Sequence, residues 1–262
     1  MLGDRPLYLI LAEIREPGNY RALWRMLCLY PRWRENLGRY FFARGRYPYR
    51  CEVRTPVGRV APTLWSSHDM LTVNEVFCRE DYRVDPAVRV VVDIGSNIGI
   101  SALYFLTRNG SSRVWCYEPV PTNVSRLQMN LSGVSSGRFS VSEVAVAERA
   151  GTVSFGVEPT GRYGGIGVDT GMTIAVTCVA INDVLEGVLA DESTIDLLKI
   201  DTEGSEVATV AAIRPDLLRR IRVIALETPQ PIALHQGLFA SSFASQTQTL
   251  RMRAARAPGP LT

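Results

Sequence analysis

The chain has 262 residues, of which 46% are hydrophobic and 21% charged, as in an ordinary soluble globular protein, so we exclude a wholly disordered chain. Its five cysteines form no CxxC pair; this pattern argues against a zinc site or a disulfide framework and favours reduced thiols in a cytoplasmic protein. The net charge is +3, and Lys199 is the only lysine among 29 basic residues. We interpret this excess of arginine as ancestry in a GC-rich genome and expect no nucleic-acid partner.

The first 50 residues are basic and rich in aromatic side chains. Their longest apolar run, residues 7–12, is too short for a membrane span or for most signal-peptide cores, so we do not expect secretion. After a Pro-Gly-Asn turn, apolar residues recur with the spacing of one helical face: Tyr20, Leu23, Trp24 and Leu27. This face either packs on the main domain or makes a peripheral contact with a membrane or an acidic partner.

Two further elements are predicted before the main domain begins. Residues 49–64 alternate around the turn 55–58, which carries Pro56 and Gly58, and this pattern predicts a hairpin. A short helix is predicted over 74–82. We therefore expect residues 1–87 to form an N-terminal helical and hairpin extension.

From residue 88 onward the pattern alternates between strands and helices, which predicts an α/β, Rossmann-like fold with a mostly parallel central sheet. The core strands are expected at 89–94, 113–118, 139–147, 195–200 and 221–226, and the helices at 98–108, 121–131, 181–189 and 203–213. Residues 151–157 and 172–179 look like an antiparallel excursion. The glycine-rich segment 161–167 between them is either a mobile lid or a simple flexible turn.

The pattern fails after Glu227. Residues 229–262 contain no acid and no convincing strand, so we expect a flexible tail. The domain would then cover residues 88–228, with its last strand left as an unprotected sheet edge and the closing C-terminal strands missing.

The first chemistry-bearing segment is Val91-Val-Asp-Ile-Gly-Ser-Asn-Ile-Gly, a buried strand followed by a glycine turn. Gly95 and Gly99 would let the backbone approach a ligand closely, and their GxxxG spacing differs from the GxGxxG of dinucleotide-binding proteins. Asp93 ends the strand, where a carboxylate favours a ligand with an ammonium or sulfonium charge and would repel a pyrophosphate. A second carboxylate, Glu118, ends the next strand at the distance expected of a group that accepts both ribose hydroxyls.

The third segment, Asp196-Leu-Leu-Lys-Ile-Asp-Thr-Glu-Gly-Ser-Glu, delivers Asp201 and Glu203 to the carboxyl edge of the sheet. These carboxylates either act on a substrate hydroxyl as a general base or positioning group, or they cap the following helix. Glu227 ends the fifth strand at the same edge and is a weaker candidate. A divalent cation is possible there but is not predicted, and with two histidines in the chain a histidine-based metal site is not expected. We interpret His68-Asp69 as a chance surface pair.

Taken together, residues 91–99, Glu118-Pro119 with Asn130 downstream, and residues 198–206 resemble the FkbM family of methyltransferases, over roughly residues 75–228. The resemblance implies S-adenosylmethionine as methyl donor and O-methylation of a hydroxyl on a sugar, glycolipid or polyketide acceptor. It also implies the following roles: Asp93, Gly95, Ser96, Asn97 and Gly99 on the methionine side of the cofactor, Glu118 and Pro119 at the ribose, Glu143, Val144 and Ala145 near the adenine, and Asp201 and Glu203 in catalysis.

Two alternatives to this function stay open. A degenerate family member would act as a non-catalytic binding module, with the basic N-terminal region as its contact surface. A nucleotide-dependent oxidoreductase on a similar fold is the other, although the missing GxGxxG and the presence of Asp93 argue against it. The sequence does not indicate an oligomeric state.

Overall fold

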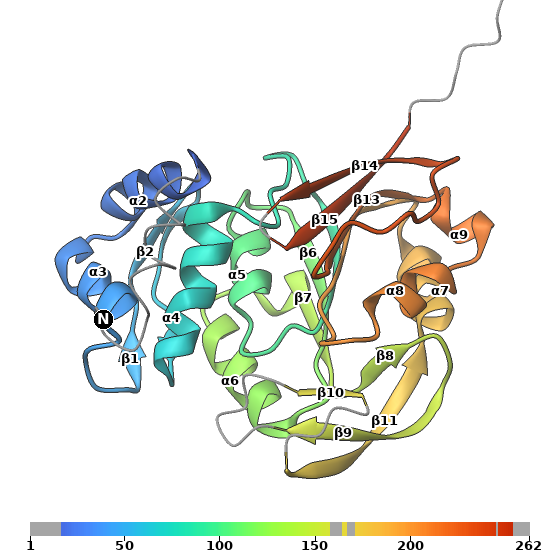
Figure 1. Ribbon diagram of the computed structural model, residues 1–262, viewed down its shortest axis with the longest axis horizontal. Coiled ribbons are helices and arrows are strands. Elements are labelled where there is room, and N and C mark those ends of the chain that lie inside the picture. The colour runs from blue at the N-terminus through green and yellow to red at the C-terminus, as the bar shows by residue number, and fades with distance from the viewer. Residues whose placement is uncertain (1–16, 158–163, 167–170, 245, 254–262) are drawn as a thin grey trace, which may run out of the picture.

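The computed structural model describes residues 17–157, 164–166, 171–244 and 246–253. A central seven-stranded sheet has the order β14-β15-β13-β12-β5-β6-β7 (Figure 1). Its parallel part consists of β5 (Val90–Ile94), β6 (Arg113–Tyr117), β7 (Phe139–Ser142), β12 (Ile195–Ile200) and β13 (Ile221–Glu227). The predicted mostly parallel, Rossmann-like sheet is therefore confirmed.

Helices cover both faces of this sheet (Figure 1). One face packs against α5 (Ile100–Leu106) and α6 (Pro121–Leu131), and the other against α7 (Ile181–Asp191), α8 (Glu206–Ala211) and α9 (Pro215–Leu218). Successive residues of β5 explain the two cores, because side chains alternate along a strand: Val91 belongs to the first core, and Val90 and Val92 to the second. All five residues of β5 are buried, as a central parallel strand requires.

The predicted flexible tail is wrong for residues 239–252, because β14 (Phe239–Ala244) and β15 (Thr247–Met252) close the sheet. Strand β15 pairs antiparallel with both β13 and β14, so β13 is not an edge. Sequence patterning missed the strands because β14 is almost wholly exposed and β15 buries a polar residue. The Gln248 side chain is satisfied by donating to the Ile232 carbonyl at 2.6 Å and accepting from its N–H at 2.9 Å. Residues 254–262 lie outside the described part of the chain.

The predicted single strand 139–147 is in fact two strands that belong to different sheets. After β7 the chain breaks at Glu143 and Val144, and β8 (Ala145–Ala147) joins a second sheet with the order β10-β9-β11-β8. In that sheet β9 (Gly151–Val157) pairs antiparallel with β11 (Thr173–Ala180) and with β10 (Gly164–Ile166), which confirms the expected antiparallel excursion. Most of the predicted lid 161–167 lies outside the described residues.

The N-terminal extension contains α2 (Pro17–Leu29), α3 (Trp33–Phe42) and the predicted hairpin, formed by β2 (Val53–Thr55) with β3 (Gly58–Val60) and by β1 (Tyr49–Arg50) with β4 (Thr63–Leu64). The buried face of α2 is not the face that the periodicity suggested for packing on the main domain. Its Ala22 and Met26 enter the core, whereas Tyr20 and Trp24 are 59% and 65% exposed. The helix carries apolar residues on both sides, so spacing alone did not distinguish them.

The link to the main domain is one continuous helical segment, which begins earlier than predicted. Helix α4 (Ser67–Val73) runs directly into the π-helix η1 (Asn74–Arg79). Ser66 and Asp69 form a capping box at its start, so Asp69 caps a helix instead of forming a chance pair with His68.

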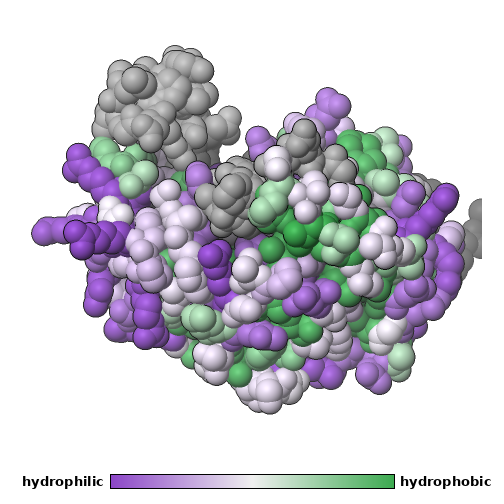
Figure 2. Space-filling model, turned by 90° about the horizontal axis from the view of Figure 1, so that it is seen from below, coloured by the Kyte–Doolittle hydropathy of each residue, from purple (hydrophilic) through white to green (hydrophobic). Residues whose placement is uncertain are grey.

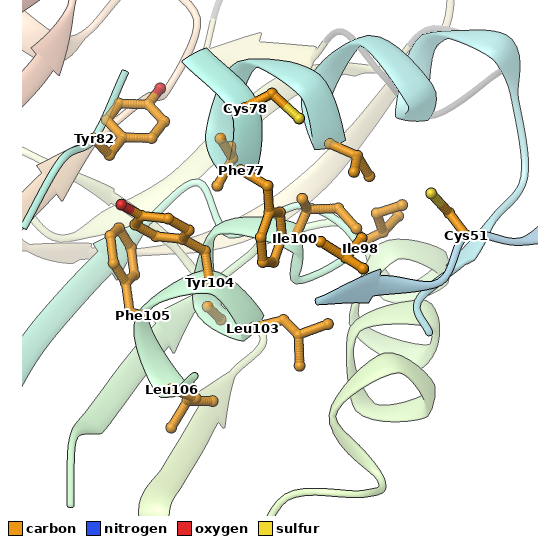
Figure 3. Close-up of a cluster of buried hydrophobic side chains, with 14 of the residues drawn as sticks. Cys51, Phe77, Cys78, Tyr82, Ile98, Ile100, Leu103, Tyr104, Phe105 and Leu106 are labelled. Carbon is orange, nitrogen blue, oxygen red and sulfur yellow. The ribbon is translucent and has the colours of Figure 1, made fainter. Parts of the chain in front are cut away.

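The extension shares its core with the main domain. In Figure 3, Phe77 of η1 lies beside Tyr104 of α5, and Cys51 of the hairpin region lies at the edge of the same cluster. The rings of Phe77 and Tyr104 meet edge to face with centroids 5.4 Å apart. One hydrophobic core therefore crosses the predicted domain boundary at 87/88. The division of the chain at that point stays a prediction. None of the helices among the described residues is both long and apolar enough to cross a membrane.

Candidate active site

The three chemistry-bearing segments end side by side at the carboxyl edge of the central sheet. Strand β5 lies between β6 and β12, with Ile94 opposite Tyr117 on one side and Ile200 on the other. The turn after β5 therefore lies between Glu118 and Asp201. Ligands of open α/β sheets bind at this edge.

Each glycine of the first turn is required by the protein's own packing. Gly95 has φ +77°, and a Cβ there would lie 1.7 Å from the Asp201 carbonyl oxygen. Gly99 has φ +83° and begins α5, where a Cβ would lie 2.9 Å from the Leu127 side chain. The two glycines were expected to let the backbone approach a ligand. In the structure they let it approach neighbouring segments of the protein itself.

The same turn places Ser96 and Asn97 differently. Ser96 is buried and its hydroxyl donates to the Asp93 carbonyl at 2.7 Å, which holds the turn closed. Asn97 has φ +46°, and its backbone N–H donates to the Glu118 carboxylate at 2.9 Å. The turn after β5 is therefore tied to the end of β6.

Asp93 lies beneath the turn and not on the surface of a cavity. It is fully buried, it accepts a hydrogen bond from the Ser101 hydroxyl at 2.6 Å, and its other oxygen lies 3.2 Å from the Lys199 ammonium. Asp93 has no exposed surface in this structure that a cofactor could contact directly. Its carboxylate acts on the site through Lys199 and Ser101.

Lys199 links the first and third segments. Its buried ammonium lies 3.3 Å from the Asp201 carboxylate and donates to the Gly95 carbonyl at 2.7 Å. Burial alone would lower the pKa of Lys199, but the carboxylates of Asp93 and Asp201 raise it above its ordinary value, so the group stays charged. Sequence analysis missed this role; the signal was a lone lysine in an otherwise apolar strand.

Glu118 is 5% exposed, and its carboxylate accepts from the backbone N–H of Asn97 and of Val120 and from the Asn123 amide. Burial raises its pKa to about 7, against the lowering effect of these hydrogen bonds. The group therefore changes charge near neutral pH in the unliganded protein.

A first cavity opens beside this carboxylate. Eight predicted site residues line it: Gly95, Asn97, Glu118, Pro119, Val144, Ala145, Asp201 and Glu203. Its remaining walls are largely apolar and include Tyr117, Val120, Val146, Phe155, Val157 and Ile166. Four other predicted site residues are not among the described residues that line it: Asp93, Ser96, Gly99 and Glu143. Figure 2 views the end of the molecule that carries the second sheet and shows hydrophobic side chains gathered near its middle.

A second cavity of 310 Å³ shares Gly95, Asn97, Asp201 and Glu203 with the first, so the two meet at these residues. It is rich in charge: Asp69, Glu75, Asp81 and Glu227 join Asp201 and Glu203, against Arg79 and Lys199. Ser96 and Tyr82 also line it. Tyr82 was missed from the sequence because it lies outside every motif and reaches the site only through the fold.

The linings of the two cavities differ in chemical character. A carboxylate beside an apolar slot suits a nucleoside, whose ribose hydroxyls donate and whose base packs on apolar walls. The acid-lined second cavity suits positive charge. Among the described residues, no cluster of three or more His, Cys, Asp or Glu side chains is arranged to hold a metal ion.

Comparison with known proteins gives a family match. The model of the methyltransferase FkbM domain matches residues 93–253. The curated methyltransferase sdnD of Sordaria araneosa is 23% identical over 204 residues, which cover 63% of this chain and 77% of that protein. The 2-O-methyltransferase NoeI of Sinorhizobium fredii is 33% identical over 66 residues, which cover 25% of this chain and 26% of that protein.

Solved methyltransferase structures also match at low similarity. A methyltransferase from Geobacter sulfurreducens has 14% identity and a TM-score of 0.39, with 70% of this chain and 78% of that chain covered. The N-terminal domain of human METTL16 in complex with SAH has 16% identity and a TM-score of 0.38, with 70% of each chain covered.

Proposed function

The chain belongs to the FkbM methyltransferase family, and on that premise we propose that it is an S-adenosylmethionine-dependent O-methyltransferase acting on a hydroxyl of a small-molecule, sugar, glycolipid or polyketide acceptor. The single observation that carries the proposal is the junction of the two cavities at Gly95, Asn97, Asp201 and Glu203. A donor in the first cavity and an acceptor in the second would meet at this junction.

In this proposal the ribose is held by Glu118, the adenine lies against Val144, Ala145 and the apolar walls, and the methionine half follows the turn 95–97. The cofactor supplies an activated methyl group. The protein supplies proximity and alignment, which are large effects when two reactants are held together. Asp201 and Glu203 orient the acceptor hydroxyl or assist in its deprotonation.

The proposal is tested by measuring acceptor-dependent formation of S-adenosylhomocysteine across a panel of hydroxyl-bearing sugars, glycolipids and polyketides. Asp201→Asn should lower kcat on a productive acceptor, because Asp201 orients the reacting hydroxyl or takes its proton, and a loss of about 10²–10⁴-fold is expected where it is itself the base. Its affinity for S-adenosylhomocysteine should change little. A fully active Asp201→Asn enzyme would remove Asp201 from the catalytic group.

Two alternatives make different predictions in simple assays. An oxidoreductase would bind NAD(P)H, and a titration that saturates with NADPH but not with S-adenosylhomocysteine would favour it. A degenerate family member would bind the methyl donor weakly or not at all.

We place the enzyme in the cytoplasm as part of the same proposal.

We further propose that α2 and α3 contact an anionic lipid surface from which the acceptor is drawn. Seven of the 11 large hydrophobic side chains that are exposed among the described residues lie between Tyr20 and Phe42. Arginines are interspersed among them, and the one acid of the two helices, Glu35, is paired with Arg39. A basic, aromatic-rich exposed face is typical of helices that lie in the membrane interface.

Sedimentation with vesicles tests this contact. Vesicles containing phosphatidylglycerol should carry the protein down and neutral phosphatidylcholine vesicles should not, and Trp24→Ser should weaken the binding. Equal recovery with both vesicles, or a self-association that Trp24→Ser disrupts, would contradict the proposal.

A further inference from the structure

The second cavity contains a hydroxyl shared by two carboxylates. The Tyr82 hydroxyl lies 3.3 Å from the Asp201 Oδ2 and 3.4 Å from the Glu227 Oε2. Tyr82 is buried, and both its burial and the neighbouring carboxylates raise its pKa well above the ordinary value, so it keeps its proton. One O–H group can donate to only one acceptor at a time. If both carboxylates were ionised, one of them would therefore receive no hydrogen bond from the Tyr82 hydroxyl.

Lys199 pairs with only one of the two carboxylates. Its buried ammonium pairs with Asp201 at 3.3 Å, so the negative charge of Asp201 is compensated. Glu227 ends β13 one strand further along, where the structure gives it no ion pair with any described residue. A proton held in this group of residues therefore resides on Glu227.

Most of the charged groups around Glu227 also favour its protonated form. Glu227 is an exposed residue, but its carboxyl group lines the second cavity, and this partial burial raises its pKa to about 8. The negative charges of Asp201, Glu203 and Glu75 raise the pKa further, and Lys199 partly offsets them. From η1, Arg79 is engaged by Asp81 and lies 3.8 Å from Glu75. Across the sheet, the residue opposite Glu227 in β15 is Thr247, which is uncharged.

We propose that Glu227 accepts the proton of the acceptor hydroxyl, and that the positive charge of the bound methyl donor is what converts Glu227 to the carboxylate that can do so. The inference rests on the proposed function, because it requires the donor and the acceptor to occupy the two cavities. Asp201 is then a positioning residue, which orients Tyr82 and is itself held by Lys199.

The charge argument follows from the cavities' shared boundary. S-adenosylmethionine carries a sulfonium charge that its product, a neutral thioether, lacks. A positive charge at that boundary favours the ionised form of Glu227, which lines the second cavity, because opposite charges attract. Donor binding would therefore release a proton from Glu227 to solvent before the reaction begins.

The transfer step then balances. A lone pair of the acceptor oxygen attacks the methyl carbon, the carbon–sulfur bond breaks, and its electron pair remains on sulfur. The hydroxyl proton passes to the Glu227 carboxylate. The sulfonium charge disappears as Glu227 becomes neutral, so the cavity returns to the charge state that it has without ligand.

Proton release on ligand binding tests the inference without knowledge of the acceptor. Titration calorimetry at pH 7.5 in phosphate and in Tris gives the number of protons released, since the two buffers differ in ionisation enthalpy. Release from Glu118 occurs with S-adenosylmethionine and S-adenosylhomocysteine alike and cancels in their difference. If the sulfonium lowers the pKa of Glu227 by about one unit, S-adenosylmethionine releases about half a proton more than S-adenosylhomocysteine.

Two variants make the result specific. Glu227→Gln should bind both ligands and lose the difference in proton release, whereas Thr72→Val, which changes an uncharged side chain of the same cavity, should keep it. Equal release by both ligands in the unaltered protein would overturn the inference, as would a difference that survives in Glu227→Gln. Failure of both ligands to bind a folded protein would instead contradict the proposed function.

Discussion

The two cavities are built in different ways from the same sheet edge. The first lies beside the ends of the neighbouring strands β5, β6 and β12, and most of its polar lining comes from short motifs that directly follow a strand. The second brings together residues that are far apart in the chain, such as Tyr82 and Glu227, which are 145 positions apart. Local sequence therefore specifies the first cavity, our proposed donor side, and the completed fold specifies the second, our proposed acceptor side. Lys199 lines the second cavity and holds Gly95 and Asp201, which line both.

The largest effect should come from breaking these contacts. Lys199→Met leaves the carboxylate of Asp93 buried without its cation, which should cost about 3–5 kcal/mol of the free energy of unfolding. Denaturation in urea measures this loss. If Lys199→Met were as stable as the parent, the ion pair between Lys199 and Asp93 would not hold the first and third segments together.

A smaller effect is expected on the acceptor side alone. Leu250 of β15 is fully buried in the core beneath α7–α9. Leu250→Ala should lower the free energy of unfolding by about 2–5 kcal/mol through the cavity that it leaves. Arg251→Ala, at the exposed neighbouring position, is the matched control and should change stability by less than about 0.5 kcal/mol. Equal effects at the two positions would mean that β15 does not pack as described.

The donor side should respond to pH through Glu118. Its pKa of about 7 lies above the ordinary value for glutamate, and ribose hydroxyls that donate to it would favour its ionised form. Affinity for S-adenosylhomocysteine should therefore be constant above pH 7 and fall by up to about tenfold per pH unit below it. Fluorescence or calorimetric titration between pH 5.5 and 8.5 measures the curve.

Glu118→Gln should remove this fall and weaken binding at pH 8 by roughly 10–100-fold, since hydrogen bonds to a charged group contribute about 1.5–3 kcal/mol. The same pH dependence in the parent and in Glu118→Gln would assign the titration to another group.

The sequence predicted those features that depend on neighbouring residues. The strand at 90–94 was recognisable as a continuous apolar run, and the glycine turn and Glu118 follow their strands directly. Eight of the predicted site residues line the first cavity for this reason. Whether each contacts the cofactor is still a prediction.

Features that depend on tertiary packing could not be predicted in this way. Strand β15 hides a buried Gln248 whose partner, Ile232, lies in a preceding loop, so its polarity resembled that of a tail. Tyr82 carries no local signal at all. Asp93 was assigned correctly to the end of a strand, but only the structure shows that Ser101 and Lys199 surround it.

Calorimetric titration of the purified protein with S-adenosylhomocysteine tests the central claim most directly. We predict saturable binding with one site per chain, abolished in Glu118→Ala, because we propose that the first cavity holds the nucleoside half of the methyl donor. No binding by a protein that is demonstrably folded, or undiminished binding in Glu118→Ala, would contradict the account of this cavity as the donor site.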